Sequence, residues 1–181
     1  MVAKRAGRTL RIDPIAEAKR QWVEHGWTDA APGMTVVTSI MRAQQLMLAR
    51  VEQTLRPFGL TFARYEMLTL LHFSRQGRMP MASAAVRLQV HPTSVTNTVD
   101  RLEASGLVKR EPHPEDGRAT LVVLTDAGRA LAIEATDALN HEVFEKPGLS
   151  PEDADALVSV IARMRRDAGD FADPRPAPEP L

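Results

Sequence analysis

The sequence contains no cysteine, which excludes structural disulfides, thiolate metal ligands and a thiol-based redox switch. It has no apolar run near the roughly 20 residues that a membrane-spanning helix needs. No apolar segment follows the basic start Met1–Arg5, as it would in a secretory signal. We therefore expect a cytoplasmic protein with no membrane partner. Net charge is lacking too, because 23 Lys and Arg residues balance 23 Asp and Glu residues, so composition alone does not indicate a nucleic-acid partner.

Motifs of catalysis and metal binding are also missing. The chain has no glycine-rich phosphate loop, nucleophile elbow or dinucleotide fingerprint. The segment His141–Glu145 resembles the start of a zinc-protease helix, but Glu145 stands where the second histidine would be. The five histidines show no close spacing that would hold zinc. We expect a protein that is not an enzyme and that has no catalytic residues, metal or cofactor.

The most informative segment is His91–Gly106, where Val95, Val99 and Leu102 follow the spacing that aligns one face of a helix. Pro92 suits the first turn of this helix and Gly106 suits its left-handed end. The opposite face carries short side chains, namely Thr93, Thr96, Asn97, Asp100 and Ala104, flanked by Ser94 and Arg101. Such groups can approach a DNA groove and bond base edges and phosphates. The alternative interpretation is an ordinary surface helix.

The neighbouring segments favour DNA recognition. A short helix over 81–88 and a three-residue turn, Gln89–His91, precede this helix and complete a helix-turn-helix pattern. Strands over 107–111 and 119–125 follow as a hairpin, with a turn at Asp116-Gly117. Arg118 leaves that turn, where it can reach a minor groove.

The rest of the sequence divides by composition and pattern. A seam of apolar residues from Met34 to Leu55, interrupted by Gln44, predicts a long helix that packs along another. Both tryptophans lie in a short preceding segment, which begins at the helix-capping pair Asp13-Pro14. The expected regions are a basic flexible arm (1–12), an extra N-terminal helix (13–27), long helices (34–58 and 126–169), the helix-turn-helix with its hairpin (60–125) and a proline-rich disordered tail (170–181).

Three motifs resemble the MarR-type family of bacterial winged-helix regulators: the segment Val90–Val108, Asp116-Gly117-Arg118, and Leu124-Thr-Asp-Ala-Gly-Arg129. The resemblance covers Leu60–Arg129. It implies a mainly α (α+β) winged helix-turn-helix fold whose long N- and C-terminal helices form a homodimer. Two recognition helices then enter successive major grooves of a near-palindromic double-stranded operator, with Arg118 in the minor groove. The expected DNA-binding residues are Pro92, Thr93, Ser94, Thr96, Asn97, Arg101, Asp116 and Arg118.

Trp22 on the extra helix resembles the branch of this family that responds to urate. Trp22 and Arg110 match that branch's pocket in type, but its aspartate falls on Glu66 and a second arginine falls on Thr98. The resemblance implies a small-molecule effector that is flat or anionic. The pocket residues would be Trp22, His25, Arg42, Tyr65, Glu66 and Arg110. The alternative is that Trp22 only packs the extra helix against the protein.

Together these patterns predict a homodimeric, sequence-specific regulator that binds double-stranded DNA, a repressor released by its effector. The alternative function is a winged-helix ligand- or protein-interaction module without operator binding, which the balanced charge favours.

Overall fold

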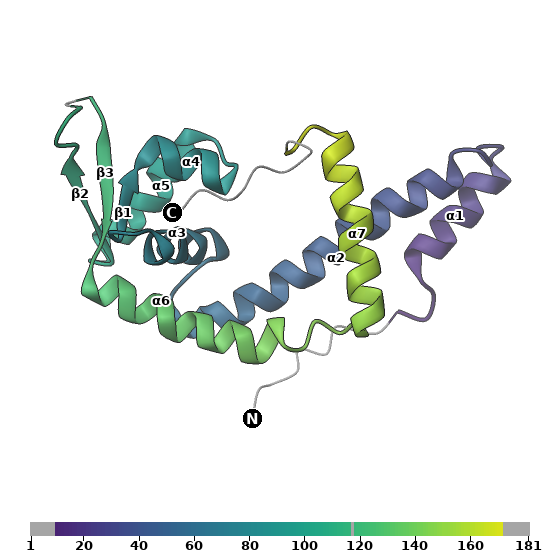
Figure 1. Ribbon diagram of the computed structural model, residues 1–181. Helices are drawn as coiled ribbons and strands as arrows, with labels where there is room; N and C mark the ends of the chain where they lie inside the picture. Colours follow the sequence, from purple (N-terminus) through teal and green to yellow (C-terminus); the bar gives the residue numbers. More distant parts are fainter. Residues whose placement is uncertain (1–9, 117, 172–181) are drawn as a thin grey trace. The chain divides into compact units, whose positions relative to one another are not determined.

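The structure is a computed structural model that describes residues 10–116 and 118–171. The chain divides into two compact units, Met1–Arg50 and Val51–Leu181, which are described separately below (Figure 1). Most of the predicted arm and tail, as well as Gly117 of the predicted turn, lie outside the described residues. None of the helices in the described ranges is both long and apolar enough to cross a membrane.

The first unit contains α1 (Pro14–Glu24) and most of α2 (Ala31–Leu55). The predicted start of α1 is confirmed, because the Asp13 carboxylate accepts a hydrogen bond from the Ile15 N–H at 3.0 Å. Helix α2 begins three residues before the predicted Met34. Pro32 and Gly33 lie within its first turn, where the missing N–H of a proline breaks no helical hydrogen bond. The helix expected to begin at residue 34 therefore includes Pro32 and Gly33 as well.

The second unit contains the predicted helix-turn-helix. After the short helix η1 (Arg56–Phe58), the chain forms α3 (Phe62–Phe73), α4 (Met81–Leu88) and α5 (Pro92–Ala104). The predicted hairpin is confirmed as β2 (Val108–Pro112) and β3 (Thr120–Leu124). A strand that was not predicted, β1 (Arg78–Pro80), pairs with the other edge of β3. The sheet is thus antiparallel with the order β1-β3-β2.

The second unit ends in α6 (Asp126–Leu139), a π-helical turn η2 (Asn140–Phe144) and α7 (Pro151–Asp167). The region 126–169, which was expected to hold long helices, thus contains α6, η2 and α7. Ser150 caps α7, since its Oγ accepts a hydrogen bond from the Asp153 N–H at 3.1 Å.

A single apolar cluster joins the elements of the second unit from the end of α2 to η2, whereas α7 contributes no buried residue. Its fully buried side chains come from α2, α3, α5, β2, β3 and α6, and include Leu55, Leu68, Leu71, Leu102, Val108, Val122 and Leu139. The seam predicted along α2 is divided: Val51 and Leu55 are in this core, whereas Val37 and Met41 are more than half exposed, at 57% and 58%. The exposed part of the seam has no partner within the described chain.

The junction between the recognition motif and α6 depends on Thr125 and Gly128. Thr125 Oγ1 donates to the carbonyl oxygens of Gly106 and Leu107, and accepts from the Gly128 N–H at 3.0 Å. Gly128 itself lies against the chain that leaves α5. A Cβ atom at this position would stand 2.0 Å from the Leu107 carbonyl oxygen. The absence of a side chain therefore allows α6 to begin there.

We expect Gly128→Ala to lower the free energy of unfolding by about 1–3 kcal/mol, because the backbone of Leu107 must move to admit the methyl group. Urea denaturation at a fixed protein concentration measures this change. Gly33→Ala is the matched control, since no atom lies within 4 Å of the Cβ position there. That variant should be neutral or stabilising by up to about 1 kcal/mol. Equal effects at the two positions would contradict the packing argument.

Candidate nucleic-acid interface

Helix α5 has one buried edge and one exposed polar edge, as its periodicity predicted. Val95, Val99 and Leu102 are at most 1% exposed and pack in the core of the second unit. The exposed residues are Pro92, Thr93, Ser94, Thr96, Asn97, Asp100, Arg101 and Ala104. Because the apolar edge is anchored, the polar edge has a fixed orientation relative to α3 and α4.

The start of α5 is shaped by a residue that sequence analysis did not select. His91 is the N-cap, and its Nδ1 accepts a hydrogen bond from the Thr93 N–H at 3.3 Å. The Thr96 hydroxyl donates to the Pro92 carbonyl oxygen at 3.2 Å. That hydroxyl still has a lone pair free, so it can accept a hydrogen bond from outside the protein.

Arg110 on β2 fixes the wing against α5. Its guanidinium pairs with Glu103, and with Asp100 at 2.5 Å, while its backbone N–H donates to Glu103 Oε1 at 2.9 Å. Burial alone would lower the pKa of Arg110, but the hydrogen bonds that its guanidinium donates to Asp100 and Glu103 raise the pKa overall. Arg110, proposed from sequence as a ligand contact, therefore has two carboxylate partners within its own lobe.

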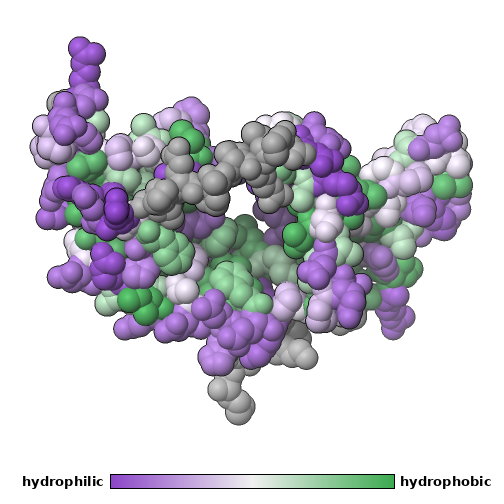
Figure 2. Space-filling model, in the orientation of Figure 1, coloured by the Kyte–Doolittle hydropathy of each residue, from purple (hydrophilic) through white to green (hydrophobic). Residues whose placement is uncertain are grey.

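The tip of the wing is organised by hydrogen bonds to its own backbone. His113 Nδ1 accepts from the N–H groups of Glu115 and Asp116, both at 3.2 Å. The Asp116 carboxylate in turn accepts from the Arg118 N–H at 3.0 Å. Asp116 thus orders the turn, and Arg118 is exposed beside it. The end of the wing, at the upper left in both views, is strongly hydrophilic (Figure 2).

A small basic hollow lies beside the polar edge of α5. Its volume is about 180 Å³, and it is lined by Thr61, Arg64, Asn97, Thr98 and Arg101. Arg64 Nε donates to Thr61 Oγ1 at 3.3 Å, so its remaining N–H groups are available. The structure therefore adds Thr61 and Arg64, from the start of α3, to the sequence-predicted residues Asn97 and Arg101. Neither was detectable from the sequence, because the approach of α3 to α5 is a tertiary contact.

Three of the predicted ligand-binding residues belong to the first unit. The Trp22 and Trp27 rings meet edge to face with centroids 5.5 Å apart, and His25 stacks on Trp27 at 5.7 Å. Trp22 and His25 are thus brought together through Trp27, which was not among the predicted contacts. Arg42 donates to Gln45 Oε1 on the same helix at 3.2 Å.

Tyr65 and Glu66 lie in the second unit, on α3. The Tyr65 hydroxyl is hydrogen-bonded to Thr136 Oγ1 of α6 at 3.1 Å. Glu66 is partly buried, and this burial raises the pKa of its carboxyl above the usual 4.5. One turn further, Thr69 Oγ1 is buried without a hydrogen-bond partner in the described part of the chain. Two polar groups on this side of α3 therefore lack full hydrogen bonding.

A helix-turn-helix followed by an antiparallel hairpin defines the winged helix-turn-helix class of proteins. The model of the MarR family matches residues 58–119, from the end of η1 to the residue before β3. A solved MarR-family transcriptional regulator, Sco5413 of Streptomyces coelicolor, is 47% identical, with a TM-score of 0.71 over 78% of this chain and 99% of that chain. The chain belongs to the MarR family of transcriptional regulators, which are not enzymes.

Other relatives agree with this assignment. An uncharacterised HTH-type transcriptional regulator of Bacillus subtilis, YdgJ, is 32% identical over 111 residues, which span 60% of this chain and 66% of that protein. Sco3205 of Streptomyces coelicolor, solved in complex with DNA, is 28% identical, with a TM-score of 0.64 over 74% of this chain and 88% of that one. BpsR of Bordetella bronchiseptica, whose DNA binding is regulated by 6-hydroxynicotinic acid, is 28% identical, with a TM-score of 0.63 over 71% and 97%. Within the described residues, no group of three or more metal-ligating side chains is placed to hold an ion.

We expect Arg110→Ala to lower the free energy of unfolding by about 1–3 kcal/mol, because it leaves Glu103 and Asp100 without their charged hydrogen-bond partner. Urea denaturation measures the loss. Arg20→Ala is the matched control: Arg20 also bridges two carboxylates, those of Glu17 and Glu24, but on the exposed surface of α1. Its removal should change little, since solvent screens exposed ion pairs. Equal losses would show that the partial burial of the Arg110 cluster adds nothing.

We expect Glu66→Gln to raise the melting temperature at about pH 7.5. The gain should shrink towards about pH 4, where Glu66 is largely protonated and therefore as neutral as the glutamine that replaces it. The raised pKa means that the folded protein holds this proton to a higher pH than the unfolded chain does. Stability therefore falls as the pH rises between the two pKa values. Thermal unfolding across this range is the measurement, with Glu134→Gln on the exposed side of α6 as the control. A lower melting temperature for Glu66→Gln at neutral pH would contradict the expectation.

Proposed function

We propose that this MarR-family protein is a homodimeric repressor that binds a specific, near-palindromic site on double-stranded DNA. The observation that carries the proposal is the exposed edge of α5, where Thr93, Ser94, Thr96, Asn97 and Arg101 face outwards while the opposite edge is buried. Short polar side chains on an anchored helix suit the major groove. The DNA complex of Sco3205 supports this assignment.

The side chains of this edge divide into base-reading and phosphate-contacting groups. The amide of Asn97 can bond an adenine through two hydrogen bonds, and an arginine can do the same with a guanine. Thr93 and Ser94, in the first turn beside Pro92, have short hydroxyls that suit phosphates. Thr61 and Arg64 extend this contact across the basic hollow they share with Arg101. Asp116 orders the turn that presents Arg118 to the minor groove.

Exposed apolar side chains on the long helices support a homodimer. On α2, Val36, Val37 and Met41 are each 57–58% exposed. On α7, Leu157, Val158, Val160 and Met164 are between 46% and 66% exposed. Apolar surface of this extent is typical of a protein interface. A two-fold axis through such an interface places two recognition helices about 34 Å apart on one face of the DNA.

An effector would release the repressor from its operator. On α3 of the second unit, Glu66 and Thr69 offer hydrogen-bonding groups that are not fully satisfied within the described residues. We favour a small, flat molecule that can donate a hydrogen bond, because Arg110 is already neutralised by two carboxylates and Glu66 disfavours an anion. The regulation of BpsR by 6-hydroxynicotinic acid supports an effector of this size.

Selection of bound DNA from a random pool tests the proposal. We expect an enriched inverted repeat with half-sites about one helical turn apart. On that DNA, Arg118→Ala should weaken binding by about 1–3 kcal/mol, or roughly 5- to 150-fold in Kd, and reduce its dependence on salt. Lys19→Ala on α1 removes the same charge from another unit and should leave the affinity unchanged. No enrichment, or enrichment of sites without symmetry, would refute the proposed function.

A further inference from the structure

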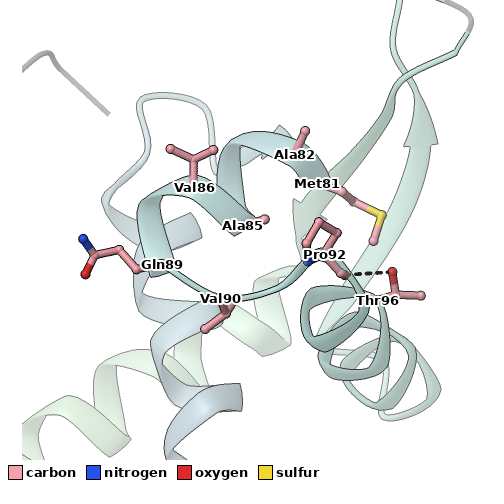
Figure 3. Close-up of a pocket in the computed structure, with 8 residues that line it drawn as sticks. All are labelled: Met81, Ala82, Ala85, Val86, Gln89, Val90, Pro92 and Thr96. Carbon is pink, nitrogen blue, oxygen red and sulfur yellow. Dashed lines mark hydrogen bonds between the residues drawn. The ribbon is translucent and has the colours of Figure 1, made fainter. Parts of the chain in front are cut away.

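An exposed apolar groove runs between α4 and α5, with a volume of about 590 Å³ (Figure 3). Its apolar lining consists of Met81, Ala82, Ala85, Val86, Val90 and Pro92. Val86 is 77% exposed and Val90 is 41% exposed. Neither valine belongs to the core cluster or to the polar edge of α5. Burial of this groove beneath an apolar segment would therefore be energetically favourable.

The chain that leaves α7 is held at the rim of this groove. Gln89, which lines the groove, donates from Nε2 to Asp170 Oδ1 at 3.1 Å. Arg165 Nε donates to the other carboxylate oxygen of Asp170 at 2.5 Å, and its guanidinium lies 5.4 Å from the centroid of the Phe171 ring. The hydrogen bond from Gln89 thus brings the end of the described chain to the helix-turn-helix, and Arg165 holds Asp170 and Phe171 from the side of α7.

Gln89 also has a backbone conformation that is unusual for a residue with a side chain. Gln89 has φ 54° and ψ 41°, and it is the one non-glycine residue with a positive φ in the described ranges. Glycine or asparagine adopts this conformation at lower cost. The hydrogen bond to Asp170 accounts for glutamine here, because the side chain is needed where the backbone alone would favour glycine.

We propose that the segment Ala172–Leu181 docks in cis into the α4–α5 groove. The segment begins two residues after Asp170 and carries prolines at positions 174, 176, 178 and 180, followed by Leu181. In the extended form that such sequences favour, ten residues span about 31 Å, which is ample to cross the groove from Gln89. Proline-rich chains suit apolar grooves because little conformational entropy is lost when they bind.

Occupation of the groove affects the recognition helix. Pro92 and Thr96, which line the groove, both lie in the first turns of α5, where the proposed DNA contacts begin. The docked segment would compete with DNA for this end of the helix and lower the apparent affinity. This regulatory consequence rests on the proposed function, whereas the docking itself does not.

The lack of native cysteine makes the docking directly testable by disulfide trapping. In the full chain, Ala82→Cys in the groove is combined with Ala177→Cys in the segment. We expect an intramolecular disulfide to form under mild oxidation roughly tenfold faster than in the control pair Ala130→Cys and Ala177→Cys, because docking raises the effective concentration of the thiols. Ala130 is equally exposed but lies on α6. Equal rates would overturn the proposal, as would a disulfide that joins two chains.

DNA affinity tests the regulatory consequence. A chain ending at Phe171 should bind the selected operator several-fold more tightly than the full chain, and roughly tenfold if the segment is docked nine-tenths of the time. Val86→Ser in the full chain should reproduce much of this gain and should add nothing to the shortened chain. Equal affinities of the full and shortened chains would refute inhibition. If neither binds DNA, the proposed function fails, and the disulfide experiment still decides whether the segment docks.

Discussion

Burial of one edge of α5 is the constraint on which the rest of the interface depends. Val95, Val99 and Leu102 are almost fully buried, and each contributes about 1.5–3 kcal/mol relative to an exposed side chain. The free-energy cost of a rotation that exposed these side chains would exceed the gain from any polar contact on the other edge. The side chains at Thr96 and Asn97 are therefore directed outwards by packing behind them, before any DNA is present.

The wing is a second element, and polar contacts add to the packing of Val108 and Val122 in the core to set its position relative to α5. Arg110 connects β2 to two acidic residues of α5, and Thr125 connects the end of β3 to the residues that follow α5. Both contacts lie near the base of the hairpin, whereas the turn at its tip is held by its own hydrogen bonds. Helix α5 and the wing consequently form one surface, and the proposed function assigns both parts of it to DNA.

Local patterns in the sequence were sufficient to predict most of the helices, the cap at Asp13 and the hairpin. Asp13, Thr125 and Ser150 each hydrogen-bond a nearby backbone N–H, so their roles are encoded within a few residues. Strand β1 was missed because three residues that include Pro80 show no alternation, and its pairing partner lies some forty residues away. The partners of Arg110 and the approach of Arg64 to Arg101 depend on tertiary packing, which neither spacing nor composition reveals.

The chain has no net charge, yet the candidate DNA interface contains Arg64, Arg101 and Arg118. Ion pairing of acidic residues within the second unit explains the difference. Asp100 and Glu103 are both engaged by Arg110, and Asp116 accepts from a backbone N–H. These three acids are therefore already engaged within the second unit. Arg64 is bound to a hydroxyl, and within the described residues Arg101 and Arg118 form no ion pair with an acid. Salt screens charges that lie more than about 10 Å apart, so approaching DNA responds mainly to the arginines of this surface. The net charge of the whole chain is therefore a poor guide to its partner.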